Sequence, residues 1–440
     1  MAGSSSGVGK TLISCGLIFA LKKSGYSVQP FKVGPDYIDP GYLSEIAKKP
    51  ARNLDVWLMG KKGVMEGFVE NSTSDISVVE GVMGYFDGSS GESNHSSTHH
   101  VASIIKSPVI LILDAAKTSR SIAATALGFK KFHRDSRIEG IILNRLGSKR
   151  HENLCRQALE PLKIPVIGCI PKDNTLSLES RHLGLIPALE KSQRKLADAA
   201  KKISAHIDME KLIQICKNAK ELPKVNTRHA KKPKVTIGVA LDSSFNFYYQ
   251  SNLENLQYQG AKIKFFSPMY DSKLPKCDGL YIGGGFPEIQ GKALSKNITI
   301  KNSVKKFAED QRPVYGECGG LMYLTNSIRY GSKNHKMVGL FDGQTHMTKM
   351  KLGYTAINTR LDCIIAGKSK KFHGHEFHYS EIKSLASDSK FAYELVTGQG
   401  IKDKKDGLTI YNTLASYGHL YFDSNNAKKF IECCISSSRR

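Results

Sequence analysis

The sequence lacks several features that would assign it to a membrane, secreted or zinc-binding class. It has no run of about 18 apolar residues, the length that a membrane-spanning helix needs, and no charged-then-apolar signal segment at its start. It also has no CxxC pair, and its nine cysteines are scattered and odd in number. This usage argues against a disulfide framework and against structural zinc. We therefore expect a cytoplasmic protein that has no membrane partner.

Acidic residues are few relative to basic ones. The 64 Lys and Arg residues exceed the 40 Asp and Glu residues and give a net charge of +24. A positive field attracts nucleic acids, but it also attracts small anions such as ATP or a polycarboxylate. Because the lysines are spread over the whole length and no nucleic-acid motif accompanies them, we expect no nucleic-acid partner. The length of 440 residues, with 40% of them hydrophobic, fits two globular domains.

A glycine-rich loop opens the chain and leads directly into a helix-like apolar pattern. In the stretch Gly3-Ser-Ser-Ser-Gly-Val-Gly-Lys-Thr11, the backbone of Gly7, Val8 and Gly9 would turn N–H groups toward phosphates. Lys10 would reach the outer phosphates, and the Thr11 hydroxyl would bind Mg²⁺. The sequence thus predicts ATP binding with Mg²⁺.

This loop departs from the usual P-loop pattern in two ways. Five residues rather than four separate Gly3 from Gly9, and in this respect it resembles the loop of dethiobiotin synthetase-like amide-forming enzymes. Only Met1 and Ala2 precede it. The strand that normally leads into such a loop is therefore expected either upstream of Met1 or not at all, which would leave the sheet without its central strand.

Carboxylates follow two of the apolar segments in this half of the chain. Asp36 and Asp39 follow an apolar segment that starts at residue 30, and Glu80 ends the segment 75–80, with Asp87 a short turn later. Since ligand groups collect at the carboxyl ends of parallel strands, Asp36 and Glu80 are candidate Mg²⁺ ligands together with Thr11. Asp39 is a candidate for orienting a substrate or a proton, and Asp87 would lie beside the transferred phosphoryl group. An ordinary turn also uses Pro and Asp, and this alternative stays open for Asp36 and Asp39.

The remaining pattern of the first half predicts a doubly wound sheet. Apolar segments at 108–113, 140–145 and 165–170 alternate with helical segments, which is typical of a mostly parallel α/β sheet. Asn144, near the end of one segment, is placed to read a nucleotide base. We expect the histidines near residues 95–100 to lie in a solvated loop.

The apolar periodicity divides the chain into three parts. We expect an ATP-binding domain over 1–190, a basic helical segment and linker over 191–233, and a second α/β domain over 234–440.

The second domain contains a cysteine at a predicted strand-to-helix turn. Cys318 lies in Pro313-Val-Tyr-Gly-Glu-Cys-Gly-Gly-Leu-Met-Tyr-Leu324, where glycines permit a sharp elbow. A helix N-terminus below the sulfur would favour the thiolate, and the Gly319 N–H would point toward a developing oxyanion. Gly284, in a triple-glycine loop after another strand, would supply the second oxyanion donor. The alternative is a buried structural cysteine. The candidate bases for a thiol nucleophile are His346, His373, His375, His378 and His419.

Several motifs together resemble the cobyrinate a,c-diamide synthase family. They occur in family order over nearly the whole chain: 3–11, 31–39, 53–55, 80–84 with Asp87, 144–148, 181–185, 245–249, 283–288, 315–320, 374–379 and 416–420. The resemblance implies a dethiobiotin synthetase-like P-loop domain followed by a class I glutaminase-like domain. It implies that Cys318 is the glutaminase nucleophile and His419 its base, and that Tyr37 and Asp39 lie near the substrate carboxylate. Class I glutaminases usually have a Glu two residues after this His, but Tyr421 stands there, so the group that orients His419 is open.

The implied reaction uses ATP, glutamine and a tetrapyrrole polycarboxylate as small-molecule substrates. ATP would phosphorylate an acetate carboxylate of cobyrinate, and ammonia released from glutamine would convert the acyl phosphate into an amide, at the a and c positions in cobalamin biosynthesis. The same motifs fit nickel-sirohydrochlorin or hydrogenobyrinate as the macrocycle. A DNA-associated P-loop ATPase is a remote alternative, and it gives the second domain no role. The oligomeric state is open, with a homodimer as one option.

Overall fold

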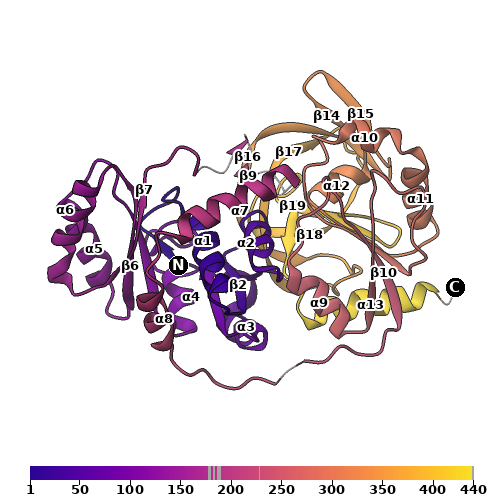
Figure 1. The fold of residues 1–440 in the computed structure, drawn as a ribbon. Helices are drawn as coiled ribbons and strands as arrows, with labels where there is room; N and C mark the ends of the chain where they lie inside the picture. The colour runs from indigo at the N-terminus through magenta and orange to yellow at the C-terminus, as the bar shows by residue number, and fades with distance from the viewer. Residues whose placement is uncertain (177–179, 182–183, 186–189, 227, 439–440) are drawn as a thin grey trace. The chain divides into compact units, whose positions relative to one another are not determined.

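The computed structural model describes residues 1–176, 180–181, 184–185, 190–226 and 228–438 (Figure 1). Within the motif 181–185, residues His182 and Leu183 lie outside the described residues. The chain forms two compact units, Met1–Thr227 and Arg228–Arg440, and each has its own hydrophobic core.

The first unit alternates strands with helices. Its strands are β1 (Ala2–Gly3), β2 (Val28–Val33), β3 (Arg52–Leu54), β4 (Ile76–Glu80), β5 (Val109–Asp114), β6 (Ile138–Leu146), β7 (Val166–Pro171) and the short pair β8 (Ser180–Arg181) and β9 (Gly184–Leu185). Its helices are α1 (Lys10–Lys23), α2 (Asp39–Ala47), α3 (Val56–Asn71), α4 (Thr98–Ile104), α5 (Ser121–Lys131), α6 (Lys149–Leu159), η1 (Glu160–Leu162), α7 (Glu190–Ser204) and α8 (Met209–Lys217).

Strand β1 lies between β4 and β5. Its two residues pair with β5, and Met1 bonds to β4 on the other side: the terminal amine donates to the Val79 carbonyl at 2.7 Å, and the Gly81 amide donates to the Met1 carbonyl at 2.8 Å. Through these bonds Met1 connects two parallel sheets, one of order β3-β2-β4 and one of order β1-β5-β6-β7. The expectation of a sheet without its central strand is wrong, because this two-residue strand holds that place and leads into the glycine-rich loop.

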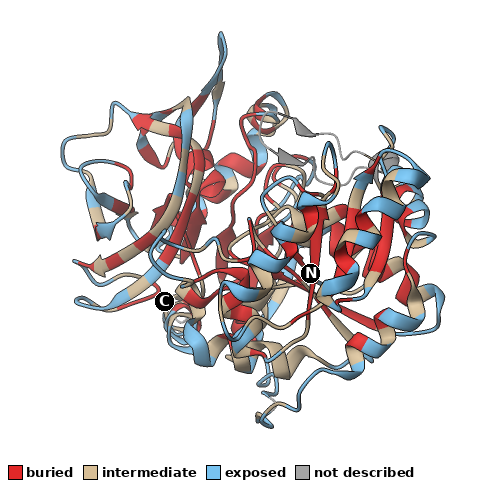
Figure 2. Ribbon diagram, turned by 90° about the vertical axis from the view of Figure 1, so that its left-hand side faces the viewer, coloured by how far each residue is buried: buried red, intermediate tan, exposed pale blue. Residues whose placement is uncertain are grey.

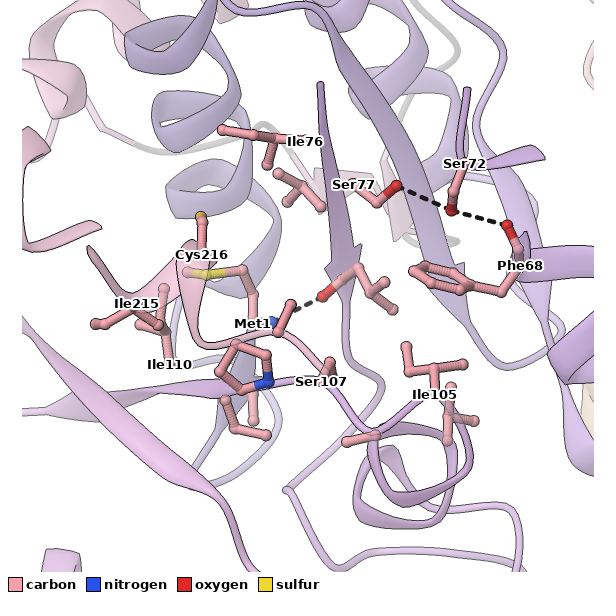
Figure 3. Close-up of a pocket in the computed structure, with 18 of the residues that line it drawn as sticks. Met1, Phe68, Ser72, Ile76, Ser77, Ile105, Ser107, Ile110, Ile215 and Cys216 are labelled. Carbon is pink, nitrogen blue, oxygen red and sulfur yellow. Dashed lines mark hydrogen bonds between the residues drawn. The ribbon is translucent and has the colours of Figure 1, made fainter. Parts of the chain in front are cut away.

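A cavity of about 350 Å³ opens next to Met1 (Figure 3). Strands β4 and β5 are five and six residues long, whereas the strand between them has two. The space beside their amino-terminal halves is therefore not filled by a strand. Side chains from β4, β5 and α8 line it, among them Ile76, Ser77, Ile110, Ile215 and Cys216.

Helices α7 and α8, from the basic segment expected at 191–233, pack into the core of the first unit. Leu196, Ala200 and Ile203 of α7 and Leu212 and Ile215 of α8 are buried in the same cluster as α1. The contact between α1 and α7 is close, since a Cβ added at Gly16 would lie 2.7 Å from the Ile203 Cβ. The helices of the basic segment thus cover the sheet that carries the glycine-rich loop.

The second unit is built on a mixed sheet. Its strands are β10 (Val235–Ala240), β11 (Ala261–Phe266), β12 (Gly279–Ile282), β13 (Val314–Glu317), β14 (Thr325–Tyr330), β15 (Lys333–Lys336), β16 (Phe341–Thr359), β17 (Lys371–Lys383), β18 (Lys390–Thr397), β19 (Lys405–Ile410), β20 (Thr413–Ser416) and β21 (Gly418–Leu420). Its helices are α9 (Gln250–Tyr258), α10 (Gly291–Lys296), α11 (Ile298–Glu309), α12 (Gly319–Leu324) and α13 (Ser424–Ser438).

The parallel part of this sheet positions the cysteine. Strands β11-β10-β12-β13-β20 are parallel neighbours, and the antiparallel strands β19, β18 and β16 continue the sheet. Strand β13 ends at Glu317 and α12 begins at Gly319, so Cys318 occupies the turn between them. The long β17 pairs with β21, which carries His419. The second unit thus brings its candidate residues to one end of its parallel strands.

In both units the buried residues concentrate on the strands and on the inner faces of the helices (Figure 2). Among the described residues, no helix is long and apolar enough to cross a membrane.

Candidate functional sites

The glycine-rich loop of the first unit has the backbone of a phosphate-binding turn. Gly7 and Gly9 have φ angles of 76° and 94°, a left-handed region that glycine enters without a steric penalty. Lys10 begins α1, and its ammonium donates to the carbonyls of Ser5 at 3.0 Å and Met83 at 2.5 Å. Burial, and then the charge of Lys32, lowers the pKa of Lys10 to about 8. The Lys10 ammonium is thus held by backbone carbonyls of the loop and of Met83.

A buried charge cluster lies beside the loop. The Thr11 hydroxyl donates to Glu80 Oε1 at 2.8 Å, and the Lys32 ammonium lies 2.8 Å from the same oxygen and 2.5 Å from Asp39 Oδ2. Burial alone would lower the pKa of Lys32, but Glu80 and Asp39 raise it above its ordinary value. Lys32 is 2% exposed and sits in the middle of this cluster as its cation.

Of the residues predicted to bind Mg²⁺, Thr11 and Glu80 are hydrogen-bonded to each other, and the charges of Lys32 and Asp39 act on Asp36. Among the described residues, no group of three or more His, Cys, Asp or Glu side chains is placed to hold a metal ion. Glu80 Oε2 is buried and has no hydrogen-bond partner among the described residues, and burial raises the pKa of Glu80 to about 7 although Lys32 opposes the shift. Asp36 Oδ1 accepts hydrogen bonds from the backbone amides of Ile38 at 2.7 Å and Asp39 at 3.0 Å, which is the pattern of an ordinary turn. Burial, and then the charge of Asp39, raises the pKa of Asp36 to about 6. Carboxylate oxygens with raised pKa values next to a threonine hydroxyl suit a hard cation.

Asn144 lies next to the loop, on β6. Its side-chain amide donates to the Val8 carbonyl at 2.8 Å, and it lines a cavity of about 290 Å³ together with Gly9, Ile13, Ile170, Pro171 and Ile203. Charged and amide residues, namely Arg145, Lys172, Asp173 and Asn174, complete the lining. Apolar walls with a few polar groups suit a small ligand such as a nucleotide base. Arg145, the neighbour of Asn144, donates to the Gly7 carbonyl at 2.7 Å and pairs with Asp114.

The two other predicted substrate residues of this unit lie in turns at the same edge of the sheet. Asp87 Oδ2 accepts the Gly84 amide at 2.7 Å, and its charge acts on Lys10. Tyr37 lies half-buried in the turn between β2 and α2, which also holds Asp36. The expectation of a solvated loop for the histidines at 95–100 holds for His95, which is exposed and lies before α4. It is wrong for His99, which lies in α4 and is buried, and burial lowers the pKa of His99 to about 4.

In the second unit, Cys318 adopts the strained backbone expected of an elbow. Its φ of 49° and ψ of −99° are unusual for a residue with a Cβ, and its amide donates to the Ser416 carbonyl at 2.7 Å. The thiol donates to the Phe377 carbonyl at 3.5 Å. Burial, and then the charge of Glu288, raises the Cys318 pKa above its ordinary value. The expected thiolate is thus corrected: α12 has only six residues, and burial outweighs the Gly319 N–H that opposes the shift.

The predicted oxyanion glycines and the predicted base lie against one another. A Cβ added at Gly319 would lie 3.4 Å from the Gly284 carbonyl carbon, and one added at Gly284 would lie 2.5 Å from His419 Cε1 and 3.3 Å from His419 Nε2. Only glycine leaves room for this approach. His419 is completely buried and pairs with His375 of β17 across the sheet. Of the other candidate bases, His346 lies on β16, and His373, His375 and His378 lie on β17.

Three charged residues of these sites were missed in the sequence. Lys32 lies between apolar strand residues, Arg145 follows Asn144, and Glu317 directly precedes Cys318. For Lys32 and Glu317, a charged residue inside a buried strand was the available signal, because burying an unpaired charge is costly. Arg145 is exposed and gave no such signal. The partners of these three residues come from distant segments, so the sequence alone could not name them.

Comparison with known proteins identifies both units. Residues 1–186 match the family model for the CobQ/CobB/MinD/ParA nucleotide binding domain, and residues 236–427 match the CobB/CobQ-like glutamine amidotransferase domain. Among solved structures, PurLQS from Thermotoga maritima matches 48% of this chain and 100% of its own, with 15% identity and a TM-score of 0.37.

Curated relatives are similar over almost the full length. The cobyrinate a,c-diamide synthase of Methanosarcina acetivorans is 40% identical over 94% of this chain and 90% of its own. Those of Methanosphaera stadtmanae and Picrophilus torridus are 42% and 41% identical, over 96% and 98% of this chain and 95% and 97% of theirs. The chain therefore belongs to the family of the cobyrinate a,c-diamide synthases.

Proposed function

We propose that this chain catalyses the ATP- and glutamine-dependent amidation of the a and c acetate carboxylates of cobyrinate, in cobalamin biosynthesis. The observation that carries the proposal is the similarity of 40–42% identity, over more than nine-tenths of the chain, to relatives that bear the name of this activity. The geometry of the two units supports it, because a nucleotide-type loop and a cysteine elbow each lie at the carboxyl ends of parallel strands.

The second unit would release ammonia from glutamine. His419 takes the Cys318 thiol proton as the sulfur attacks the side-chain amide carbon, and the N–H groups of Gly284 and Gly319 stabilise the resulting oxyanion. The proton then passes from His419 to the leaving nitrogen, so that ammonia departs and a thioester remains. Water then attacks the thioester and gives a proton to His419. The carbon–sulfur bond breaks, glutamate is released, and the sulfur takes the proton from His419 to restore the thiol. The raised pKa of Cys318 supports this assignment, because a thiol at rest needs such a base.

The first unit would activate the substrate carboxylate. The loop 3–11 and Lys10 bind the triphosphate of ATP, and Asn144 contacts the base. Mg²⁺ bound by Thr11, Glu80 and Asp36 would neutralise charge on the phosphates. The carboxylate oxygen attacks the γ-phosphorus and ADP leaves, with Tyr37, Asp39 and Asp87 positioning the two reactants. Ammonia then displaces phosphate from the acyl phosphate and forms the amide.

Cys318→Ala tests the division of labour between the units. We expect loss of glutamine-dependent amidation, because no other group at the elbow can form the thioester, and retention of amidation supplied with ammonium salt. The measurement is the product mass from cobyrinate and ATP with each nitrogen source. Cys433→Ala, at a half-buried position on α13, is the matched control and should behave as the unsubstituted protein.

Two outcomes of this experiment contradict the proposal. Amidation by Cys318→Ala with glutamine as the sole nitrogen source would remove Cys318 from the mechanism. Failure of the unsubstituted protein to amidate cobyrinate with ammonia would show that cobyrinate is not the substrate. Parallel incubations with nickel-sirohydrochlorin and hydrogenobyrinate would then identify the macrocycle.

A further inference from the structure

We infer that Glu317, the residue directly before the nucleophile, is the positioning residue that orients His419 and stabilises its protonated form. The inference rests on the proposed glutaminase activity and extends it. It answers how the imidazole is held although Tyr421 stands where a carboxylate is usual in class I glutaminases.

Glu317 faces the correct edge of the imidazole. Its Oε2 lies 3.6 Å from His419 Nδ1, and both side chains are almost completely buried, with exposures of 1% and 0%. On the same ring, Cε1 and Nε2 face Gly284, the predicted oxyanion donor. A base that uses Nε2 toward the thiol needs an acceptor at Nδ1, and Glu317 is placed to be that acceptor. The distance exceeds that of a hydrogen bond, and catalytic contacts of this kind commonly shorten when substrate binds.

The carboxylate is itself held in place from three sides. Tyr315 donates to Oε1 at 2.7 Å, the Leu420 amide donates to Oε1 at 3.2 Å, and Tyr281 donates to Oε2 at 3.0 Å. The two tyrosines come from the adjacent parallel strands β12 and β13, and Leu420 follows His419 on β21. Both oxygens of the buried carboxylate are therefore hydrogen-bonded, which fixes the orientation of the group. The amide of Leu420 also fixes the carboxylate to the strand that carries the imidazole.

No other described carboxylate around His419 is available for this role. Glu376, opposite Gly418 in the β17–β21 register, accepts the amides of Gln399 and Gly400. Asp406 accepts the amides of Gly407, Tyr417 and Gly418. Both carboxylates are therefore engaged with backbone turns.

The histidines that face His419 from β17 carry no charge near neutral pH. Burial lowers the pKa of His375 and of His378 to about 3. Glu288, beside Cys318, has its pKa raised to about 7 by burial. Glu317 is thus the carboxylate placed to compensate a proton that arrives on His419, which is the step that the thiol's raised pKa requires.

The test is Glu317→Gln in the full-length protein, assayed as glutamate release from glutamine. We expect kcat to fall by at least about 100-fold with KM for glutamine nearly unchanged, because the amide cannot stabilise an imidazolium. The acidic limb of the kcat/KM profile should move to lower pH, since a neutral amide replaces the carboxylate beside the imidazole. A purely structural role would lower the rate without moving this limb. Ammonia-dependent amidation should be unchanged.

Two further variants keep the inference testable if Glu317→Gln does not fold. Glu317→Asp keeps the charge, so its acidic limb should stay where the unsubstituted protein has it, even if kcat falls. Tyr281→Phe removes one donor to Oε2, and kcat should fall by less than about tenfold. A folded Glu317→Gln with kcat within threefold of the unsubstituted protein, or with an unmoved acidic limb, overturns the inference. Absence of glutamate release from the unsubstituted protein overturns the proposed glutaminase activity and this inference with it, whereas a defect confined to Glu317→Gln leaves that activity standing.

Discussion

At the scale of single residues, the nucleotide unit depends on a buried lysine. Lys32 and Glu80 are buried, Asp39 is 14% exposed, and Lys32 offsets the charges of both carboxylates. A buried ion pair adds little net stability when it is complete, but removal of one partner leaves the other charge buried and uncompensated. The stability of the first unit should therefore respond strongly to this one side chain.

Lys32→Met should lower the free energy of unfolding of the first unit by about 3–5 kcal/mol, the range for breaking a buried ion pair. The measurement is urea unfolding followed by fluorescence of Trp57, the only tryptophan of the chain, which lies in α3. Lys48→Met is the control, because its pairing with Glu45 is exposed and should contribute less than about 1 kcal/mol. Equal effects of the two substitutions would contradict a structural role for the charge cluster.

At the scale of elements, the contact of α1 with α7 depends on a residue without a Cβ. Gly16 of α1 lets Ile203 of α7 approach closely, so α7 packs against the helix that follows the glycine-rich loop. A glycine inside a helix costs about 1 kcal/mol relative to alanine. Here the close packing outweighs that cost.

Gly16→Ala should destabilise the first unit by about 1–3 kcal/mol, because the new methyl group would overlap Ile203. Gly128→Ala in α5 is the matched control: the position is exposed and a Cβ there meets nothing within 4 Å. It should stabilise the protein by about 0.5–1 kcal/mol through helix propensity alone. Both are measured by urea unfolding with Trp57 fluorescence, and the same sign for both would refute the packing argument.

At the scale of the whole molecule, the second unit buries imidazoles that the unfolded chain would protonate. His378 stacks on Tyr417 with ring centroids 3.7 Å apart and contacts the Ser380 carbonyl at 2.8 Å, and burial lowers its pKa to about 3. A depressed histidine pKa means that the unfolded state binds more protons between pH 3 and 6.5. The neutral His378 imidazole therefore makes its full contribution to the free energy of unfolding above the ordinary pKa of 6.5, and this contribution is lost as pH falls toward 3.

We expect the free energy of unfolding of the second unit to fall between pH 6.5 and 5. The phenyl ring of His378→Phe keeps the stacking but does not titrate. In this variant, the free energy of unfolding should fall less steeply with decreasing pH than in the unsubstituted protein, by up to about 1.4 kcal/mol per pH unit. The measurement is circular dichroism in urea at several pH values, with the first unit identified separately by Trp57 fluorescence. An unchanged slope would mean that His378 is not kept neutral in the folded protein.

The sequence by itself determined the α/β class of both halves and the segments that carry their chemistry. Glycines at 7 and 9 and the elbow around Cys318 are local signals, because they reflect backbone conformations that few residues adopt. The alternation of apolar segments likewise depends on neighbours along the chain, so β4, β5, β6 and β7 could be predicted with nearly their observed bounds.

Only the tertiary structure decided which distant groups meet and what burial does to their charges. The contact of Lys32 with Glu80, the place of the two-residue β1 between β4 and β5, and the approach of Glu317 to His419 all join segments far apart in sequence. The protonation of Cys318 was mispredicted for the same reason: a helix terminus can be read from a local pattern, whereas desolvation depends on everything packed around the sulfur.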